Sequence, residues 1–412
     1  MPDPSTCKTV LIIGYVWPEP NSSAAGSRML QLIEFFLAQD WAVTFASAAA
    51  GSSHMADIES LGVRKAAVAL NDRSFDEFIC ALNPDLVLFD RFMIEEQFGW
   101  RVARHCPDAL RLLDTEDLHC LRHARHQALK AGREVSPQDL NSDMAKREVA
   151  AILRCDLTLM ISQYEIELLT GHYGVAANLL LHLPFMLPER PGEPFRPFER
   201  RHDFISIGNF RHAPNWDAVL FLKETIWPLI RAQQPQAQLR LYGAYPPPRA
   251  SRLHNPGQGF LVEGWAEDAH RVMRQARVCL APLRFGAGLK GKLIDAMSNG
   301  TPNVTTAIGA ESMHADLPWS GAVADDPQDF AAAAARLHQD RQQWGQAQEN
   351  GRRILEQCYH ATRLAERLLG RLNELGQTLA SHRLKNFTGA MLQHHRMQST
   401  RYMAQWIEAK NS

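Results

Sequence analysis

The stretch that decides the fold of this chain is Phe285-Gly286-Ala287-Gly288-Leu289-Lys290-Gly291-Lys292-Leu293-Ile294-Asp295. Its glycines let the backbone turn and approach a ligand closely, and a helix that begins here directs free N–H groups toward an anion. Lys290 and Lys292 add positive charge, and Asp295, about one turn further on, is suited to ribose hydroxyls. The stretch therefore predicts a site for a nucleoside diphosphate.

A glycine-containing turn with two solvated lysines would have the same spacing, so the flanking residues decide between the two interpretations. Residues 277–283 have the pattern of a short buried strand, and Gly300 with Pro302 ends the helix before a second strand at 303–306. This order predicts a βαβ unit whose loop lies at the carboxyl end of a strand. Open parallel sheets bind ligands at that edge.

Strands and helices alternate on both sides of this unit, which predicts two doubly wound parallel sheets. In the first half, strands are expected over 9–14, 42–47, 85–90, 110–114, 156–162 and 178–183, with helices over 29–37 and 144–153. In the second half, strands are expected over 204–208, 238–243, 259–264, 278–282 and 303–306. Prolines and charges cluster over 184–194, which predicts a hinge, and Asp326 is suited to cap a helix that begins at Pro327.

Two segments resemble the family 4 glycosyltransferases, which are retaining enzymes with the GT-B fold and nucleotide-sugar donors. Residues 286–296, with Gly300-Thr301-Pro302 and residues 306–311, are similar to that family's donor-site region. Residues 207–218 are similar to the strand and loop that open its second domain. The resemblance covers roughly residues 200 to 345 well and the first half more loosely.

The resemblance implies an α/β fold of GT-B type, in which two Rossmann-like domains face a cleft and a helical C-terminal extension follows. The domains expected are an acceptor-side domain over 1–190, a nucleotide-sugar-binding domain over 191–365 and a helical tail over 366–412. It also implies hexosyl transfer with retention, in which lysines 290 and 292 and the loop amides stabilise the leaving diphosphate. Arg211 either assists the phosphates or caps its own loop.

One departure from the family pattern concerns its two glutamates, which are separated by seven residues. Asp295 stands at the second position, which the family associates with the donor ribose. Ala287 stands at the first, which the family associates with the transferred sugar. Glu311 is either a substitute sugar contact or a solvated loop residue, so the identity of the sugar stays open.

Two first-half segments are expected at the same site. The loop after residues 9–14 holds Gly14, Gly26, Ser27 and Arg28, which the resemblance places near the donor and acceptor, although a structural turn would use the same residue types. The polar segment 114–126 follows another strand, and its Asp117 and His119 are candidate catalytic groups for proton transfer or for binding sugar hydroxyls.

No metal or other cofactor is expected. His119 and His123 have the spacing of a helical metal pair, but the sequence offers no compelling third ligand and no Asp-x-Asp triplet. A metal-independent enzyme is therefore the preferred interpretation.

Composition excludes several classes of protein. The 44 Lys and Arg residues nearly balance the 45 Asp and Glu residues, so the net charge of -1 produces no global field for nucleic acid. The seven cysteines are odd in number and scattered, which favours reduced thiols in a cytoplasmic protein. Residues 1–8 lack a signal-peptide pattern, and no apolar run is long enough for stable membrane insertion.

The partners expected are a nucleotide-sugar donor and an acceptor that is a glycan, a lipid-linked glycan or a tRNA. Basic residues of the tail are candidates for contact with an anionic acceptor, or form a solvated helix face: His382, Arg383, Lys385, His394, His395, Arg396 and Arg401. A GT-B phosphorylase or epimerase is the nearest alternative function. A nucleotide-sugar sensor without catalysis is the other, because Ala287 replaces an acid.

Overall fold

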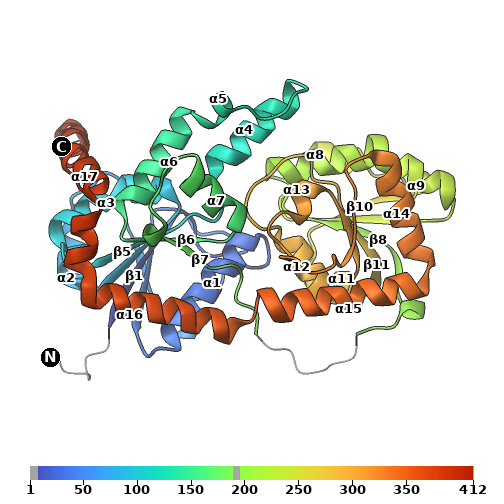
Figure 1. The fold of residues 1–412 in the computed structure, drawn as a ribbon, viewed down its shortest axis with the longest axis horizontal. Coiled ribbons are helices and arrows are strands. Elements are labelled where there is room, and N and C mark those ends of the chain that lie inside the picture. Colours follow the sequence, from blue (N-terminus) through green and yellow to red (C-terminus); the bar gives the residue numbers. More distant parts are fainter. Residues whose placement is uncertain (1–7, 189–194, 412) are drawn as a thin grey trace.

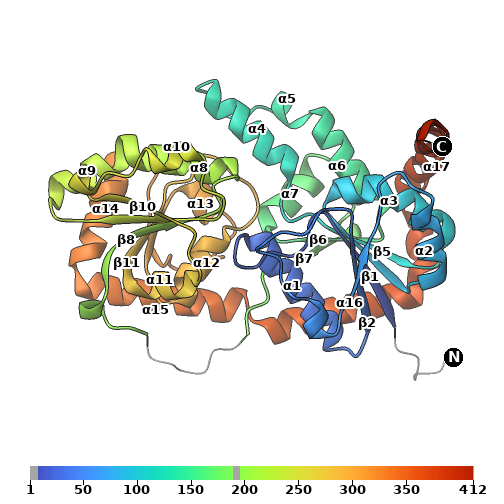
Figure 2. The same ribbon diagram turned by 180° about the vertical axis from the view of Figure 1, so that it is seen from behind.

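The computed structural model describes residues 8–188 and 195–411, apart from the side chains of 395–401 and 411, and forms two lobes side by side (Figure 1). Each lobe contains one parallel sheet with helices on both faces, as the view from behind also shows (Figure 2). The strand order is β3-β2-β1-β4-β5-β6-β7 in the first lobe and β10-β9-β8-β11-β12-β13 in the second. The expected pair of doubly wound sheets is confirmed.

The strands of the first lobe are β1 (Thr9–Gly14), β2 (Ala42–Ser47), β3 (Arg64–Ala67), β4 (Leu86–Asp90), β5 (Leu110–Asp114), β6 (Leu157–Met160) and β7 (Leu180–His182). Those of the second lobe are β8 (His202–Ile207), β9 (Leu239–Tyr242), β10 (Phe260–Gly264), β11 (Ala276–Ala281), β12 (Asn303–Thr305) and β13 (Gly321–Val323). The central strands β1 and β4 are almost wholly buried apolar runs, as strands covered on both faces require.

The helices of the first lobe are α1 (Ala24–Leu37), α2 (Ser74–Leu82), α3 (Phe92–His105), α4 (His119–Lys130), α5 (Pro137–Leu140), α6 (Asp143–Arg154) and α7 (Gln163–Gly171). Those of the second lobe are α8 (Ala213–Phe221), α9 (Trp227–Gln233), α10 (Pro248–Ser251), α11 (Ala269–Gln275), α12 (Gly291–Ser298), α13 (Ala307–Ala310), α14 (Pro327–Gln339) and α15 (Arg341–Cys358). A π-helical segment, Leu222–Ile226, joins α8 to α9, and α16 (Ala361–Lys385) and α17 (Phe387–Asn411) complete the chain.

Two edge strands, β3 and β13, were not expected from the sequence. Each is short and carries polar or small residues, so neither shows an apolar run. Pairing with β2 and β12 creates them, which is a tertiary effect. The predicted cap of α14 is confirmed, because the Asp326 side chain accepts hydrogen bonds from the N–H groups of Gln328 and Asp329.

The chain crosses back from the second lobe to the first between α15 and α16 (Figure 1). Leu187, where the chain leaves the first lobe, pairs with the α15–α16 junction: its N–H donates to Tyr359 O, and Ala361 N donates to Leu187 O. Buried leucines of α16 pack with the core between β1 and α1: Leu364, Leu368, Leu372 and Leu375. Helix α16 is therefore part of the first lobe's hydrophobic core. The rest of the expected hinge, 189–194, lies outside the described residues.

The basic cluster in the tail does not form a free acceptor-binding face at Arg383. Its guanidinium bonds Asp156 Oδ1 and Oδ2 at 2.8 and 2.7 Å, and the His382 ring bonds Asp156 O at 2.8 Å. Arg383 is therefore not part of a solvated helix face, because its charge is used to attach α16 to the first-lobe sheet. Lys385 is exposed, and the side chain of Arg396 lies outside the described part.

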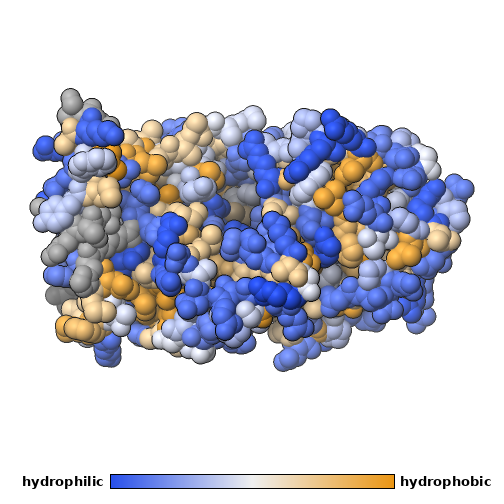
Figure 3. All heavy atoms as spheres, turned by 90° about the horizontal axis from the view of Figure 1, so that it is seen from above, coloured by the Kyte–Doolittle hydropathy of each residue, from blue (hydrophilic) through white to orange (hydrophobic). Residues whose placement is uncertain are grey.

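The described surface is largely hydrophilic (Figure 3), and the described thiols are free. Viewed from above, the molecule shows mostly hydrophilic residues with smaller hydrophobic areas between them (Figure 3). No helix among the described residues is long and apolar enough to cross a membrane. The described cysteines are unpaired thiols, as expected: Cys80, Cys106, Cys120, Cys155, Cys279 and Cys358.

Candidate active site between the two lobes

The predicted diphosphate loop connects β11 to α12 and lies against the first lobe. Gly288 has φ +61, a left-handed conformation that favours glycine. A Cβ at Gly291 would come within 2.5 Å of Ala24 Cβ in the first lobe. Within the described chain, no side chain caps the start of α12. The glycines thus let the two lobes approach closely, and the helix start keeps its amides available.

Both predicted lysines are held near the start of α12. The Lys292 ammonium donates to Asn215 Oδ1 at 2.8 Å, and the Lys290 ammonium donates to Gly288 O at 2.7 Å. Burial lowers the pKa of each lysine to about 8. Removing these ammonium groups from water costs free energy, and an anionic ligand would offset that cost.

The predicted residues Asp117 and His119 lie at the carboxyl end of β5, with His119 Nε2 at 3.4 Å from Asp117 Oδ1. Arg122 forms an ion pair with the same carboxylate. Burial works to raise the pKa of Asp117, but Arg122, His119 and His212 outweigh it and hold the value at about 2. Burial lowers the pKa of His119 to about 4, so at neutral pH an anionic carboxylate lies beside a neutral imidazole.

His212 brings the second lobe into this group. It lies in the loop after β8, and burial followed by the charge of Arg122 lowers its pKa to about 4. Both Asp117 and Lys292 act on it electrostatically. The arrangement therefore joins the first-lobe loop of Asp117 to the second-lobe lysine across the interface.

Glu165, on α7, was missed by the sequence analysis. Its Oε1 accepts hydrogen bonds from Gly288 N at 2.8 Å and from Leu118 N at 2.9 Å, and the residue is 0% exposed. Burial, followed by the charge of Asp117, raises its pKa to about 8. The signal that could have found it is its position in the segment after β6, at the sheet edge where ligands bind.

Glu311 forms an ion pair across the interface. Arg125, on α4, reaches its two carboxylate oxygens at 2.6 and 2.9 Å and also donates to Gly286 O at 2.8 Å. The sequence left two interpretations of Glu311 open, a sugar contact or a solvated loop residue. This ion pair excludes the solvated loop residue. The same arginine fixes Gly286 at the start of the predicted loop.

The other predicted donor contacts lie around this centre. Arg211 lies over the ring of Tyr245, with 3.7 Å from its guanidinium carbon to the ring centre. Asp295 lies within α12 and acts electrostatically, with Lys292, on the thiol of Cys279. Tyr245 in turn bonds Glu19 of the first lobe at 3.1 Å. Arg211 and Tyr245 of the second lobe thus form a contact with the loop after β1 through Glu19.

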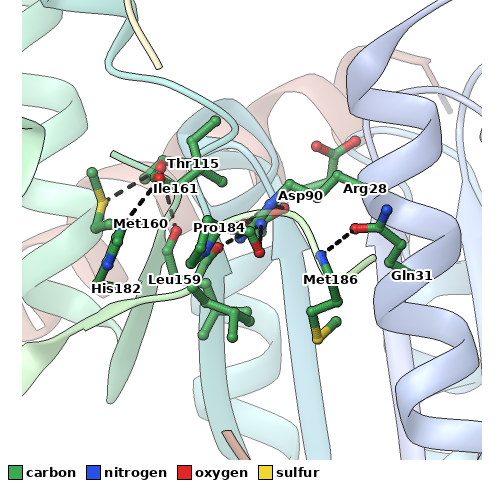
Figure 4. A network of polar contacts seen from close by, with 12 residues as sticks. Arg28, Gln31, Asp90, Thr115, Leu159, Met160, Ile161, His182, Pro184 and Met186 are labelled. Carbon is green, nitrogen blue, oxygen red and sulfur yellow. Dashed lines mark hydrogen bonds and ion pairs between the residues drawn. The ribbon is translucent and has the colours of Figure 1, made fainter. Parts of the chain in front are cut away.

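The loop after β1 is shaped by packing. A Cβ at Gly14 would come within 2.3 Å of the Phe45 ring, and one at Gly26 within 2.3 Å of the backbone of Glu19. Arg28 is 1% exposed and forms an ion pair with Asp114 at 2.7 Å, while its Nη1 donates to Leu183 O at 2.7 Å. The same Nη1 is 3.4 Å from Pro184 O, and Arg28 and Pro184 are labelled in Figure 4. Arg28 is therefore not a ligand contact: its charge is used within the first lobe, where it holds the chain that leaves β7.

The residues needed for a bound metal do not converge. Within 8–188 and 195–411 no group of three or more His, Cys, Asp or Glu side chains could hold a metal ion. Lysines 290 and 292 and the start of α12 supply positive charge at the interface, beside the ion-paired Arg122 and Arg125. The arrangement can bind an anion on one side and present a carboxylate and an imidazole on the other.

Comparison with known proteins agrees with this geometry. Residues 201–340 match the family model of the glycosyl transferases group 1. No curated protein matches the chain in sequence.

Several solved structures share the fold of the whole chain. Sucrose-phosphate synthase from Thermosynechococcus elongatus is 16% identical, with a TM-score of 0.65, over 91% of this chain and 100% of that one. Anabaena HepE, solved in complex with UDP and glucose, is 13% identical, with a TM-score of 0.68, over 89% of this chain and 100% of that one. TarM is 10% identical, with a TM-score of 0.67, over 90% of this chain and 100% of that one.

At these identities the solved structures show the fold, which confirms the expected GT-B architecture. The family match covers residues 201–340, which contain the predicted diphosphate loop and both lysines. The chain therefore has the GT-B fold, and most of its second lobe matches the family model of the glycosyl transferases group 1.

Proposed function

We propose that the protein transfers a hexosyl group from a nucleotide-sugar donor to an acceptor, with retention of anomeric configuration and without a metal ion. One observation carries the proposal: Lys290, which is buried, and Lys292, which is half-buried, lie at the start of α12, and the charge of Asp117 in the first lobe acts on Lys290. A UDP-sugar is the first donor to test, because HepE was solved with UDP and glucose.

The proposed roles follow from charge. As the bond between the anomeric carbon and phosphate lengthens, Lys290, Lys292 and the amides of the loop stabilise the negative charge of the leaving diphosphate. Asp117, ionised at neutral pH, stabilises the positive charge that develops on the sugar. Neutral His119 binds a sugar hydroxyl, and the leaving phosphate takes the acceptor's proton.

Further contacts complete the proposed donor site. Asp295 accepts hydrogen bonds from the ribose, and Arg211 assists the phosphates. Gly14, Gly26, Gly286 and Gly288 let the backbone approach the donor, and Glu311 acts through its ion pair with Arg125 on the loop that contacts the sugar. The proposed acceptor is a glycan or a lipid-linked glycan. A tRNA is the third candidate, although Arg383 is used inside the fold.

The first test measures thermal unfolding in the presence of UDP-, GDP-, ADP- and TDP-sugars. A ligand that binds only the native state raises the melting temperature, so one nucleotide class should stabilise the protein more than the others. Product analysis then separates enzyme from sensor. A sensor would bind the donor and leave it intact, whereas the proposed enzyme releases nucleoside diphosphate when an acceptor is present.

Substitution of Lys292 tests the proposed role of the lysines at the leaving diphosphate. Lys292→Ala should lower kcat/KM for the donor by about 10²-fold, because it removes charge at the leaving group. Lys146→Ala on α6, whose side chain is 64% exposed, is the matched control and should behave as wild type. Unchanged kinetics in a folded Lys292→Ala protein would refute the assignment.

A further inference from the structure

A second group of reactive side chains lies at the outer end of the first lobe. The Cys80 thiol, on α2, is 3.3 Å from Nδ1 of His105, the last residue of α3. On the other side of the ring, His105 Nε2 is 3.4 Å from Asp76 Oδ1. The order thiol, imidazole, carboxylate is that of a nucleophile, its base and the group that orients the base.

The proposed chemistry requires one tautomer of the histidine ring. His105 Nε2 and Asp76 Oδ1 are buried 3.4 Å apart, and neither atom makes a hydrogen bond within the described residues. With the ring proton on Nε2, beside the carboxylate, the lone pair of Nδ1 faces the thiol at 3.3 Å. Arg101 holds the carboxylate in place by donating to Asp76 Oδ2 at 2.6 Å.

A hollow of about 470 Å³ opens beside the thiol between α2, α3 and α17. Its lining includes the three reactive side chains and three arginines, and Cys80 is exposed. Arg101 is bonded to Asp76 and Glu408, and Arg73 lies 3.9 Å from Glu77. Arg104, exposed, makes no ion pair within the described chain and is free to meet an anion.

The site is separate from the interface between the lobes. Helices α2 and α17 lie at the end of the first lobe that is turned away from the second lobe (Figures 1 and 2). None of the residues proposed for glycosyl transfer belongs to α2, α3 or α17. The thiol, its base and the arginines are therefore not explained by that reaction.

We propose that Cys80, His105 and Asp76 form a second reactive site, at which the thiol undergoes exchange with small anionic disulfides. His105 Nδ1 takes the proton from Sγ, and the resulting thiolate attacks one sulfur of the disulfide. A bond forms between Cys80 Sγ and that sulfur, the original S–S bond breaks, and the other half leaves as a thiolate. Cys80 is oxidised to a mixed disulfide, and the leaving thiolate, which is the reduced half, takes the proton from His105.

The experiment treats the full-length protein with dithiobis(nitrobenzoate), an aromatic disulfide with two carboxylates, and follows each cysteine by peptide mass. Cys80 should react before Cys358, which is partly buried and serves as the internal reference. His105→Gln should slow the reaction of Cys80 by about 10-fold, because the thiol loses its base. The control His172→Gln changes an exposed histidine at the end of α7 and should leave the rate unchanged.

A second comparison tests the anionic preference. Arg104→Ala should slow the reaction with dithiobis(nitrobenzoate) more than the reaction with dithiodipyridine, an uncharged disulfide. Equal effects on both reagents would overturn the anionic part of the proposal. A Cys80 rate no greater than that of Cys358, or no effect of His105→Gln in a protein that melts at the wild-type temperature, would overturn the site itself.

If His105→Gln does not fold, the pH dependence of the Cys80 reaction rate in the wild-type protein tests the proposal. The charged groups around the thiol are those of Arg73, Asp76, Glu77, Arg101, Arg104, His105 and Glu408. A thiol paired with an imidazole reacts at a rate that changes little between about pH 7 and pH 8. A rate for Cys80 that rises about tenfold per pH unit is the behaviour of an unassisted thiol and would overturn the proposal.

Discussion

Glu165 couples the two lobes through a single carboxyl oxygen. That oxygen accepts from Leu118 N in the first lobe and from Gly288 N in the second, while Oε2 is buried and has no hydrogen-bond partner among the described residues. With a pKa of about 8, the group is mostly protonated at neutral pH. An uncharged carboxyl group can still accept these two hydrogen bonds. The neutral acid also avoids the free-energy cost of burying a carboxylate.

The stability of the protein should therefore depend on pH through Glu165. Because its folded pKa is raised above the ordinary value of 4.5, its contribution is fully present below that value and is lost as the pH rises through about 8. Between the two values the free energy of unfolding should fall by up to about 1.4 kcal/mol per pH unit from this group. Glu165→Gln removes the titration and should flatten the profile measured by urea unfolding.

Glu167→Gln, an exposed change on the same helix, is the matched control for this profile. Glu165→Ala should cost about 1–3 kcal/mol at neutral pH, because it leaves buried N–H groups without an acceptor. Equal pH profiles for the wild type and Glu165→Gln would show that the carboxyl group does not titrate as expected.

Lys290 and Lys292 predict the pH dependence of donor use. Both have a pKa of about 8, so their charge is lost as the pH rises through that value. The ratio kcat/KM for the donor reports the free enzyme and should fall above about pH 8. Because Glu165 titrates in the same range, the measurement is repeated with Glu165→Gln, which should keep the alkaline fall. A profile that is flat to pH 10 would contradict the role of the lysines.

At the scale of elements, α16 is a helix with two different halves. Leu368 is 0% exposed in the core of the first lobe, whereas Leu384, near the end of the helix, is 83% exposed. Burial of one apolar stripe, and not helix propensity, attaches this helix to the sheet. The crossing from the second lobe is thus held by side-chain packing.

The two leucines give a matched pair of substitutions. Leu368→Ala should lower the free energy of unfolding by about 2–5 kcal/mol, because it removes buried methyl groups and leaves a cavity. Leu384→Ala should change it by no more than about 0.5 kcal/mol. Chemical denaturation of both proteins measures the difference. Similar losses in the two variants would mean that α16 does not pack as described.

At the scale of the whole molecule, the site exists only where the lobes meet. A small interface core joins Ile161 and Phe185 of the first lobe to Leu293 and Met297 of α12. Around it, Arg125 with Glu311 and Glu19 with Tyr245 link loops of the two lobes. The same contacts that join the lobes also position the loop between β11 and α12.

Glycosyl transfer at the interface between the lobes should not require a divalent cation. Transfer is expected to continue at the same rate in EDTA, because the lysines and the start of α12 meet the charge of the diphosphate. A rate assay with and without EDTA, followed by addition of magnesium or manganese, measures this. Activity that disappears with EDTA and returns with the metal would refute the metal-free mechanism.

Much of the local structure could be predicted from the sequence. The bounds of β1, β2 and β5 agree with the expected strands, because each is an apolar run between turn residues. The loop before α12 was predicted because glycines, lysines and a helix start are adjacent in the chain. These features depend on neighbours within a few residues, so a short stretch of sequence is enough to predict them.

The sequence by itself determined the two alternating α/β halves, the glycine-rich loop before α12 and the cap of α14. Only the tertiary structure decided that Glu165 meets Gly288, that Arg125 meets Glu311 and that Arg383 binds Asp156. These partners lie more than a hundred residues apart in the chain, and no local pattern records which charges will meet. Burial then decides the outcome, because a charged group taken out of water must find a partner or change its protonation state.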